Sequence, residues 1–280
     1  MHGAIAAETS AGACATPFIK RSIPRANVQH LATACPALDA LLDGGLESDA
    51  ITLVFGEGGS GKTNLALQCA REAAKAGKRI AYVDTEGVSG VRLRQVFLGA
   101  VQKPLVTSNA GGIGQEAQLN SDPAGHLSDE DEQTLRELES RVLFITPYTI
   151  EEQERMVLNA TKLPGLGLVV VDSINMHYRL HIAGGDDAES EAARSLYKQL
   201  HHLTGFARQN NVPVLVTGQV YGGEDTTQPF ARRVMEHLVK ALLRFEKKAD
   251  GSRKATILKH RSIEEGRGAR FRIGSTGLES

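Results

Sequence analysis

Short apolar runs recur along the chain and are separated by stretches of mixed polar and apolar character. Each run has five or six residues and is rich in Val, Ile, Leu or other apolar residues. Continuous apolar runs of this length are typical of strands buried on both faces, and their alternation with helical stretches predicts a mainly parallel sheet flanked by helices. The five runs are 51–55, 79–84, 142–146, 168–172 and 212–217. We therefore expect an α/β fold.

Three later apolar runs follow one another too closely for helices to lie between them. They are 241–246, 255–259 and 270–273. Successive strands with short connections pair antiparallel, so these runs predict antiparallel strands at one edge of the sheet.

Helices are predicted in three of the stretches between the parallel strands. Residues 62–75 are mostly good helix formers, and Gly77 ends this helix. Thr149 and Glu152 form a capping box, which begins a second helix that runs to about residue 160. A third helix is indicated by three leucines that share one face: Leu196, Leu200 and Leu203.

The length of 280 residues suits one full α/β domain. We expect this domain to cover residues 31–280 and to follow a flexible arm at residues 1–30. Residues 105–135 are rich in Gly, Asn, Ser, Asp and Glu and contain few large apolar groups. They predict a polar, acidic and mobile insertion between two elements of the core.

The net charge of −1 hides two regions of opposite sign. Residues 105–155 contain 11 acidic and 3 basic side chains, whereas residues 228–280 contain 13 Lys or Arg and 6 Asp or Glu. A basic segment of this kind attracts polyanions such as DNA, although a solvated charged face explains the same composition.

The cysteines and the start of the chain bear on its location. Cys14, Cys35 and Cys69 lack the paired spacings of zinc or redox sites, which favours a reducing compartment. No apolar run approaches the length of a membrane span, and the first residues lack the basic start of a signal peptide. We therefore expect a cytoplasmic protein with no membrane partner.

The strongest chemical signal is a Gly-rich loop between the first buried strand and the helix at 62–75. It matches the eight-residue phosphate-loop pattern in full. Its glycines let successive backbone N–H groups point at phosphates, beside the positive end of the helix. In this pattern the lysine binds the β- and γ-phosphates of ATP, and the following hydroxyl binds Mg²⁺. The predicted ATP-binding residues are Gly56, Glu57, Gly58, Gly59, Ser60, Gly61, Lys62 and Thr63.

Three polar residues at the ends of predicted strands are candidates for the rest of this site. Asp172 follows an apolar strand and is the expected ligand of Mg²⁺, together with Thr63. Glu86 follows the second strand, where a carboxylate can orient water against the γ-phosphate. Gln219 follows the fifth strand, and its amide can bond the γ-phosphate and report its loss. Glu86, Gln219 and Lys62 are thus the expected catalytic residues, with an exposed polar loop position as the alternative for the first two.

Glu57 is unusual because it places a negative charge inside the phosphate loop. Repulsion between this carboxylate and the phosphates predicts a weak affinity for ATP. Replacement of Glu57 by Ser or Pro is therefore expected to tighten ATP binding.

The order of these motifs resembles the RecA/RadA family of recombinases. The phosphate loop is followed by Asp-Thr-Glu-Gly at 84–87, Val-Val-Asp-Ser at 170–173 and Thr-Gly-Gln-Val at 217–220. The lead-in at 38–46 fits the same family, and the resemblance spans roughly residues 31–273. RadA recombinases carry a helix-hairpin-helix domain and a Phe-x-x-Ala linker before this core. Neither is expected here, so the chain is more similar to RadB, the archaeal group that consists of the core alone.

Similarity to RadB implies an ATP-binding, DNA-binding accessory protein that mediates or regulates homologous recombination and DNA repair. It implies weak Mg²⁺-dependent ATP hydrolysis, no strand exchange of its own, and work beside a RadA recombinase and a Holliday-junction resolvase. The DNA is expected to be single-stranded and bound without regard to sequence. The candidate DNA contacts are Arg232, Arg233, Lys240 and Arg244.

Two alternatives stay open. A KaiC-like regulatory ATPase of the RecA superfamily shares the phosphate loop, and it acts on protein partners without DNA. The basic strands near the C-terminus distinguish the two, because a KaiC-like protein is expected to lack them. In the other alternative the nucleotide is bound and never hydrolysed, since Glu86 is assigned by position only.

Overall fold

The computed structural model describes residues 28–101, 127–182, 185–220 and 232–280. A nine-stranded sheet forms its centre, with the strand order β11-β10-β9-β8-β3-β7-β6-β4-β5. The six neighbours from β8 to β5 are all parallel. They are β3 (Ile51–Gly56), β4 (Arg79–Asp84), β5 (Val142–Ile145), β6 (Leu166–Asp172), β7 (Val214–Gln219) and β8 (Ala241–Lys247). The predicted parallel sheet is confirmed.

Three antiparallel strands extend the sheet beyond β8. They are β9 (Arg253–Lys259), β10 (Gly268–Gly274) and β11 (Gly277–Glu279). The antiparallel edge is confirmed, with one correction, because β8 itself pairs parallel to β3 and only its other side is antiparallel. The connection from β7 to β8 runs through α8 (Arg232–Leu238) and is long enough for a parallel crossover.

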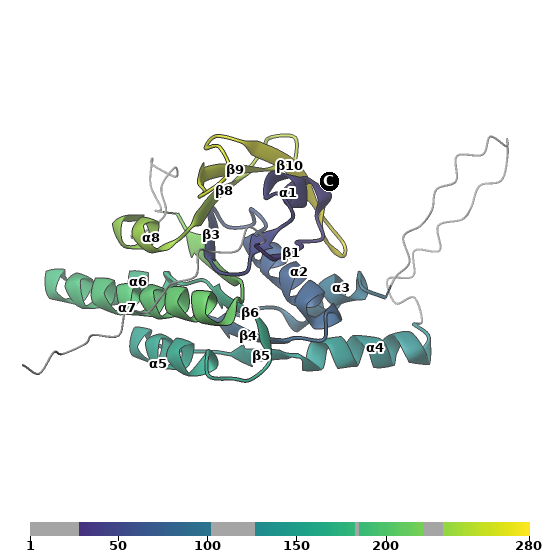
Figure 1. Ribbon diagram of the computed structural model, residues 1–280, viewed down its shortest axis with the longest axis horizontal. Coiled ribbons are helices and arrows are strands. Elements are labelled where there is room, and N and C mark those ends of the chain that lie inside the picture. Colours follow the sequence, from purple (N-terminus) through teal and green to yellow (C-terminus); the bar gives the residue numbers. More distant parts are fainter. Residues whose placement is uncertain (1–27, 102–126, 183–184, 221–231) are drawn as a thin grey trace, which may run out of the picture.

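Helices cover both faces of the sheet (Figure 1). One face carries α2 (Lys62–Lys75), α3 (Gly90–Leu98) and α4 (Asp129–Ser140). The opposite face carries α5 (Ile150–Ala160), α6 (Met176–His181), α7 (Asp186–Asn210) and α8. Because both faces are covered, alternate residues of β3 enter different cores: Val54 packs toward α2, whereas Leu53 and Phe55 pack toward α7. This explains the continuous apolar runs in the sequence.

The predicted helix boundaries agree with the structure. The first helix covers Lys62–Lys75 and the second covers Ile150–Ala160. The Thr149 Oγ1 accepts a hydrogen bond from the Glu152 backbone at 3.2 Å, which is one half of the predicted capping box. The Glu152 carboxylate accepts its bond from the Tyr148 backbone instead of that of Thr149. The three leucines of α7 are fully buried against the sheet.

Two predicted boundaries need correction. The sequence predicts an N-terminal arm that reaches residue 30, but His30 lies in β1 (His30–Leu31), which pairs with β2 (Leu46–Glu47) across α1 (Pro36–Leu41). The predicted insertion reaches residue 135, but α4 begins at residue 129. Ser128 caps this helix, and Leu135 and Leu138 are buried on one face, so two apolar residues suffice to dock a highly charged helix. Residues 1–27 and 102–126 lie outside the described part.

Within the described residues, no helix combines the length and the apolar character needed to cross a membrane.

Candidate nucleotide site

The carboxyl ends of four parallel strands bring the predicted site residues together. Gly56 at the end of β3 pairs with Gln219 at the end of β7, and Asp84 at the end of β4 pairs with Asp172 at the end of β6. Strand order places β7 and β6 between β3 and β4. The phosphate loop, Glu86, Asp172 and Gln219 therefore lie together at the carboxyl ends of the strands, as ligand sites do in other open α/β sheets. We call this part of the molecule the nucleotide edge.

The phosphate loop joins β3 to α2, and its glycines meet two separate demands. A Cβ on Gly56 would lie 2.1 Å from the Phe245 carbonyl oxygen, so the neighbouring strand β8 leaves no room for a side chain there. Gly61 adopts a φ of 107° at the N-cap of α2, a conformation that favours glycine. The loop thus turns tightly enough to aim the first N–H groups of α2 at a bound phosphate.

Two side chains of the loop fit a polyphosphate. The buried hydroxyl of Ser60 has no hydrogen-bond partner among the residues described, so it is available to a ligand. The Lys62 ammonium donates hydrogen bonds to the carbonyls of Gly56 at 2.8 Å and Glu57 at 3.0 Å. Burial lowers the pKa of Lys62, and the nearby Glu86 and Asp172 oppose this shift. These features match the requirements of a nucleoside triphosphate site.

Asp172 is the most deeply buried carboxylate of the site, with 1% of its surface exposed. Its Oδ2 accepts a hydrogen bond from the Tyr82 hydroxyl at 2.8 Å, and its Oδ1 accepts one from the Thr217 hydroxyl. Burial raises the pKa of Asp172, while the bonds from Thr217 and Tyr82 oppose the rise. Sequence reasoning missed Tyr82 and Thr217, because only the strand pairing shows that β4 and β7 flank β6.

The predicted Mg²⁺ ligands lie together. The Thr63 side chain is among the groups that lower the pKa of Asp172, so the two side chains are neighbours. A hydroxyl and a carboxylate are the hard oxygen ligands that Mg²⁺ prefers, and Mg²⁺ in such sites takes its other ligands from water and phosphates. Within the described residues no group of three or more His, Cys, Asp or Glu could hold a metal by itself. The site therefore fits Mg²⁺ bound with a nucleotide.

The turn after β4 is shaped by Asp84. Its carboxylate accepts hydrogen bonds from the backbone of Glu86 at 3.1 Å, Gly87 at 2.9 Å and Val88 at 2.7 Å. These bonds hold the turn that carries Glu86, whose exposed side chain meets Gln219 at the end of β7. The role of Asp84 has a sequence signal, since an Asp side chain often bonds to the backbone that follows it in a turn.

Gln219 connects the nucleotide edge to α6. Its amide nitrogen donates to Glu86 Oε1 at 2.8 Å, and its amide oxygen accepts a hydrogen bond from the Arg179 guanidinium. The buried Asn175 holds the Gln219 backbone with two hydrogen bonds, each of 3.0 Å. Glu86 and Gln219, predicted separately, are thus direct partners, and Arg179 and Asn175 are additions that the sequence reasoning did not make.

Of the four candidate DNA contacts, the two whose side chains the structure describes, Lys240 and Arg244, lie apart. Arg232 and Arg233 begin α8, and their side chains lie outside the described part of the chain. The Lys240 backbone donates to the carbonyl of Ile51, the first residue of β3. Lys240 therefore lies at the amino ends of the parallel strands, and the phosphate loop lies at their carboxyl ends. Arg244 lies within β8, and its guanidinium is 3.4 Å from the Glu246 carboxylate.

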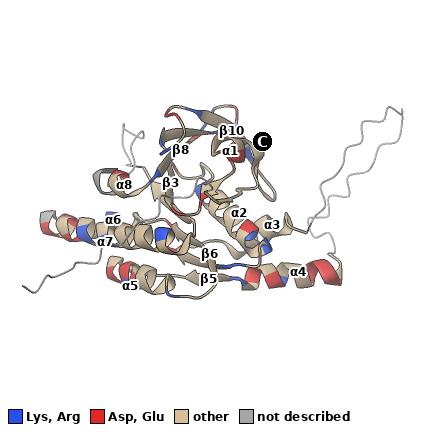
Figure 2. Cartoon of the chain, viewed as in Figure 1, with Lys and Arg blue, Asp and Glu red and all other residues tan. Residues whose placement is uncertain are grey.

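Figure 2 shows the predicted charge asymmetry in space. Acidic residues gather along α4, whose first turn alone contains four of them. Basic residues are frequent on β8, β9 and β10. The two charged regions lie on different parts of the molecule. The net charge is therefore small although each region has a strong charge of its own sign.

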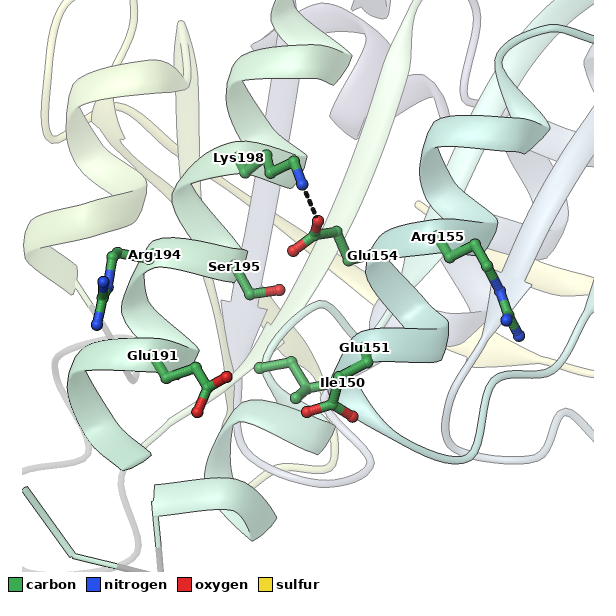
Figure 3. Close-up of a pocket in the computed structure, with 8 residues that line it drawn as sticks. All are labelled: Ile150, Glu151, Glu154, Arg155, Glu191, Arg194, Ser195 and Lys198. Carbon is green, nitrogen blue, oxygen red and sulfur yellow. Dashed lines mark hydrogen bonds and ion pairs between the residues drawn. The ribbon is translucent and has the colours of Figure 1, made fainter. Parts of the chain in front are cut away.

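A hollow of about 420 Å³ lies elsewhere, between α5 and α7 (Figure 3). Three acidic and three basic side chains surround it, and Lys198 is ion-paired with Glu154. Its lining residues are Ile150, Glu151, Glu154, Arg155, Glu191, Arg194, Ser195 and Lys198. This balance of charges favours neither a phosphate nor a metal ion, so the hollow is a poor alternative to the nucleotide edge.

A parallel sheet that carries a phosphate loop on a central strand and a buried carboxylate two strands away defines a RecA-type P-loop nucleoside triphosphatase. Comparisons with known proteins agree with this class. A family model described as an AAA domain matches residues 20–225. The crystal structure of a RadB recombinase is 35% identical to the chain, with a TM-score of 0.66, and the match covers 89% of this chain and 99% of that one.

Curated relatives narrow the class further. Three proteins named DNA repair and recombination protein RadB are similar over most of their length. The one from Halobacterium salinarum is 34% identical over 90% of this chain and 95% of its own. The one from Thermoplasma acidophilum is 33% identical (90% and 94%), and the one from Methanococcoides burtonii is 32% identical (89% and 97%). The chain belongs to the RadB family.

Family membership decides one of the alternatives raised by the sequence. The RadB relatives match about nine tenths of this chain, which favours RadB over a KaiC-like protein. The prediction of a RecA-type core is confirmed. The roles of the individual site residues stay predictions.

Proposed function

We propose that this protein is an ATP-binding and DNA-binding accessory factor of homologous recombination and DNA repair, with weak ATP hydrolysis and no strand exchange of its own. The names of its RadB relatives support a role in DNA repair and recombination. The fit of the phosphate-loop residues to a polyphosphate supports the ligand. The small number of described aromatic residues near the basic strands favours binding through phosphates rather than base stacking.

Each residue of the nucleotide edge has a proposed role. The loop N–H groups and Lys62 bind the β- and γ-phosphates, and Thr63 and Asp172 hold Mg²⁺, which when bound neutralises charge on the phosphates. Glu86 orients the attacking water and accepts its proton. Tyr82 and Thr217 fix the orientation of the Asp172 carboxylate through their hydrogen bonds.

The surroundings of Glu86 support the proposal of weak hydrolysis. Its Oε1 is occupied by the Gln219 amide at 2.8 Å, and the side chain is exposed to solvent. A carboxylate that already accepts a hydrogen bond from an amide, and that is exposed to water, activates an attacking water molecule less effectively than a buried base does. Glu57 adds a negative charge near the phosphates.

The observation that carries the proposal is the bridge from Glu86 through Gln219 to Arg179. A γ-phosphate is expected to compete for the Gln219 amide, which would alter its bonds to Glu86 and to Arg179 of α6. Gln219 is also the last residue of β7 and directly precedes the segment that leads to Arg232 and Arg233. We therefore propose that bound ATP sets the affinity for DNA through this residue.

DNA binding is proposed for the basic C-terminal region, with Arg232, Arg233, Lys240 and Arg244 as candidate contacts. Each phosphate that such residues neutralise contributes about 0.9 to the slope of log K against log salt for duplex DNA and about 0.7 for single strands. Binding of this kind does not depend on sequence. The proposed protein partners are a RadA recombinase and a Holliday-junction resolvase.

Binding to a fluorescent single-stranded oligonucleotide, measured at low salt with and without a non-hydrolysable ATP analogue, tests the proposal. We expect measurable binding that changes when the analogue is added and that weakens steeply with salt. Gln219→Ala should retain binding of the analogue and lose its effect on DNA. An absence of DNA binding in both states at low salt would overturn the proposal.

A further inference from the structure

The turn between β8 and β9 lies against the phosphate loop. The Arg253 guanidinium donates a hydrogen bond to the Gly59 carbonyl at 3.3 Å. The Lys247 backbone N–H donates to Glu57 Oε1, also at 3.3 Å. The hairpin is therefore tied to both sides of the loop that we assign to the nucleotide phosphates.

Glu57 makes its contact where the sheet stops. The pairing of β3 with β8 ends at Gly56 and Phe245, because the chain turns into the phosphate loop there. Lys247 is two residues further along β8, and its N–H would lack a strand partner on that side. The Glu57 carboxylate takes the place of a backbone acceptor, which gives this unusual loop residue a structural role.

The Lys247 side chain reaches the loop itself. A Cβ built on Gly59 would lie 3.2 Å from Lys247 Cε and 3.3 Å from its Nζ, so the ammonium group lies directly beside the loop backbone. Its charge is close enough to contribute to the lowered pKa of Lys62. In the part of the chain that the structure describes, no hydrogen bond or ion pair engages this ammonium group.

Lys247 and Arg253 are also directly opposite each other in the β8–β9 ladder. Like charges at directly opposed positions destabilise an antiparallel pair. The buried Nε of Arg253 has no partner within the described residues, so its hydrogen-bonding capacity is not used in full. Two neighbouring cations at the mouth of a phosphate loop are favourable when an anion lies beside them, and Glu57 supplies only one negative charge.

We propose that Lys247 is a further phosphate-binding residue of the nucleotide site, held over the phosphate loop by the contacts of Glu57 and Arg253. Its ligand is the β- or γ-phosphate of a nucleoside triphosphate, so it distinguishes a triphosphate from a monophosphate. The inference rests on the proposed binding of ATP. It also offsets the repulsion that Glu57 alone would cause.

Equilibrium dissociation constants for ATP and AMP, measured with Mg²⁺ by titration calorimetry, test this role. Lys247→Ala should weaken ATP binding about tenfold, as expected for the loss of one charge-assisted hydrogen bond, and leave AMP binding unchanged. Lys247→Arg should restore most of the ATP affinity because it keeps the charge. Lys248→Ala is the matched control, since it removes the same charge from the next residue, whose ammonium lies near Glu246.

The outcomes are distinct. Unchanged ATP affinity in Lys247→Ala would overturn the inference, and so would an equal loss for ATP and AMP or an equal loss in Lys248→Ala. In each of these cases the wild-type protein still binds ATP, and the proposed function stands. A wild-type protein that binds no ATP would overturn the proposed function together with this inference.

Discussion

The nucleotide edge and the basic C-terminal region differ in how their candidate residues are held. At the nucleotide edge, Asp172, Glu86 and Gln219 lie on or just after neighbouring strands. Glu86 is hydrogen-bonded to Gln219, and Asp172 is hydrogen-bonded to Thr217. In the basic region, Lys240 and Arg244 belong to one short stretch of chain, yet Lys240 lies toward the edge far from the phosphate loop. Strand pairing therefore brings specific side chains together in a site, whereas a high number of basic residues in a segment shows only that it has a positive electrostatic potential.

This contrast predicts different responses to mutation. Loss of a residue at the nucleotide edge should strongly impair either ATP binding or hydrolysis, because each side chain there has its own partner and position. Loss of one of the candidate DNA contacts in the C-terminal region should weaken DNA binding by small and similar steps. The following predictions test the contrast, beginning with the largest expected effect.

Lys62→Ala should weaken ATP binding by about 100-fold or more, because it removes a charge-assisted bond to the phosphates inside a buried site. Titration calorimetry with ATP measures the change. Lys75→Ala is the control, since Lys75 lies on the same helix, is exposed and pairs with Glu72. Equal affinities for Lys62→Ala and the wild type would remove the phosphate loop from the nucleotide site.

Glu86→Gln should retain ATP binding and slow hydrolysis by about 100-fold, the usual contribution of a general base. Single-turnover release of phosphate measures the rate. Glu152→Gln serves as a control of equal chemistry, because Glu152 caps α5 through its bond to the Tyr148 backbone. Equal rates for Glu86→Gln and the wild type would show that Glu86 takes no part in hydrolysis.

Arg232→Ala combined with Arg233→Ala should reduce affinity for single-stranded DNA about tenfold at low salt and lower the salt slope by about 0.7 for each phosphate that is no longer neutralised. Fluorescence anisotropy at several salt concentrations measures both values. Lys240→Ala should have a smaller effect if the DNA lies near the nucleotide edge. A larger effect for Lys240→Ala would place the DNA at the opposite edge of the sheet.

The smallest expected effect concerns the stability of the protein without nucleotide or Mg²⁺. Burial raises the pKa of Asp172 above its unfolded value, so folding is favoured by the protonated form. This contribution is present at a pH below the unfolded pKa and is lost as the pH rises through the folded pKa. Asp172→Asn should therefore increase stability at neutral pH by on the order of 1 kcal/mol, a typical size for a buried polar group.

Urea unfolding in EDTA, at neutral pH and again at a pH near the ordinary pKa of aspartate, measures this difference. The stabilisation by Asp172→Asn should shrink as the pH falls, because the wild-type carboxyl becomes protonated. A stabilisation that does not depend on pH would mean that the Asp172 charge is not its cause. Mg²⁺ with ATP should reverse the order, since the carboxylate is then a ligand.

Much of this protein could be predicted from local pattern alone. The apolar runs determined the parallel strands, because a strand covered on both faces needs apolar residues at every position. The phosphate loop determined the nucleotide site, since the backbone conformation and the lysine belong to one short segment. Thr149 likewise determined the start of α5, because a helix cap depends on neighbours in sequence.

Tertiary structure alone decided which distant side chains meet. Strand order brought Tyr82 and Thr217 to Asp172, and it brought Gln219 to Glu86. It also placed Lys247 beside Gly59, which is far from it in sequence. The helix α4 was not predicted from the sequence, because only two leucines among its many charged residues pack against the core. Such contacts arise from pairing between strands distant in the chain, and no local pattern of residues encodes that pairing.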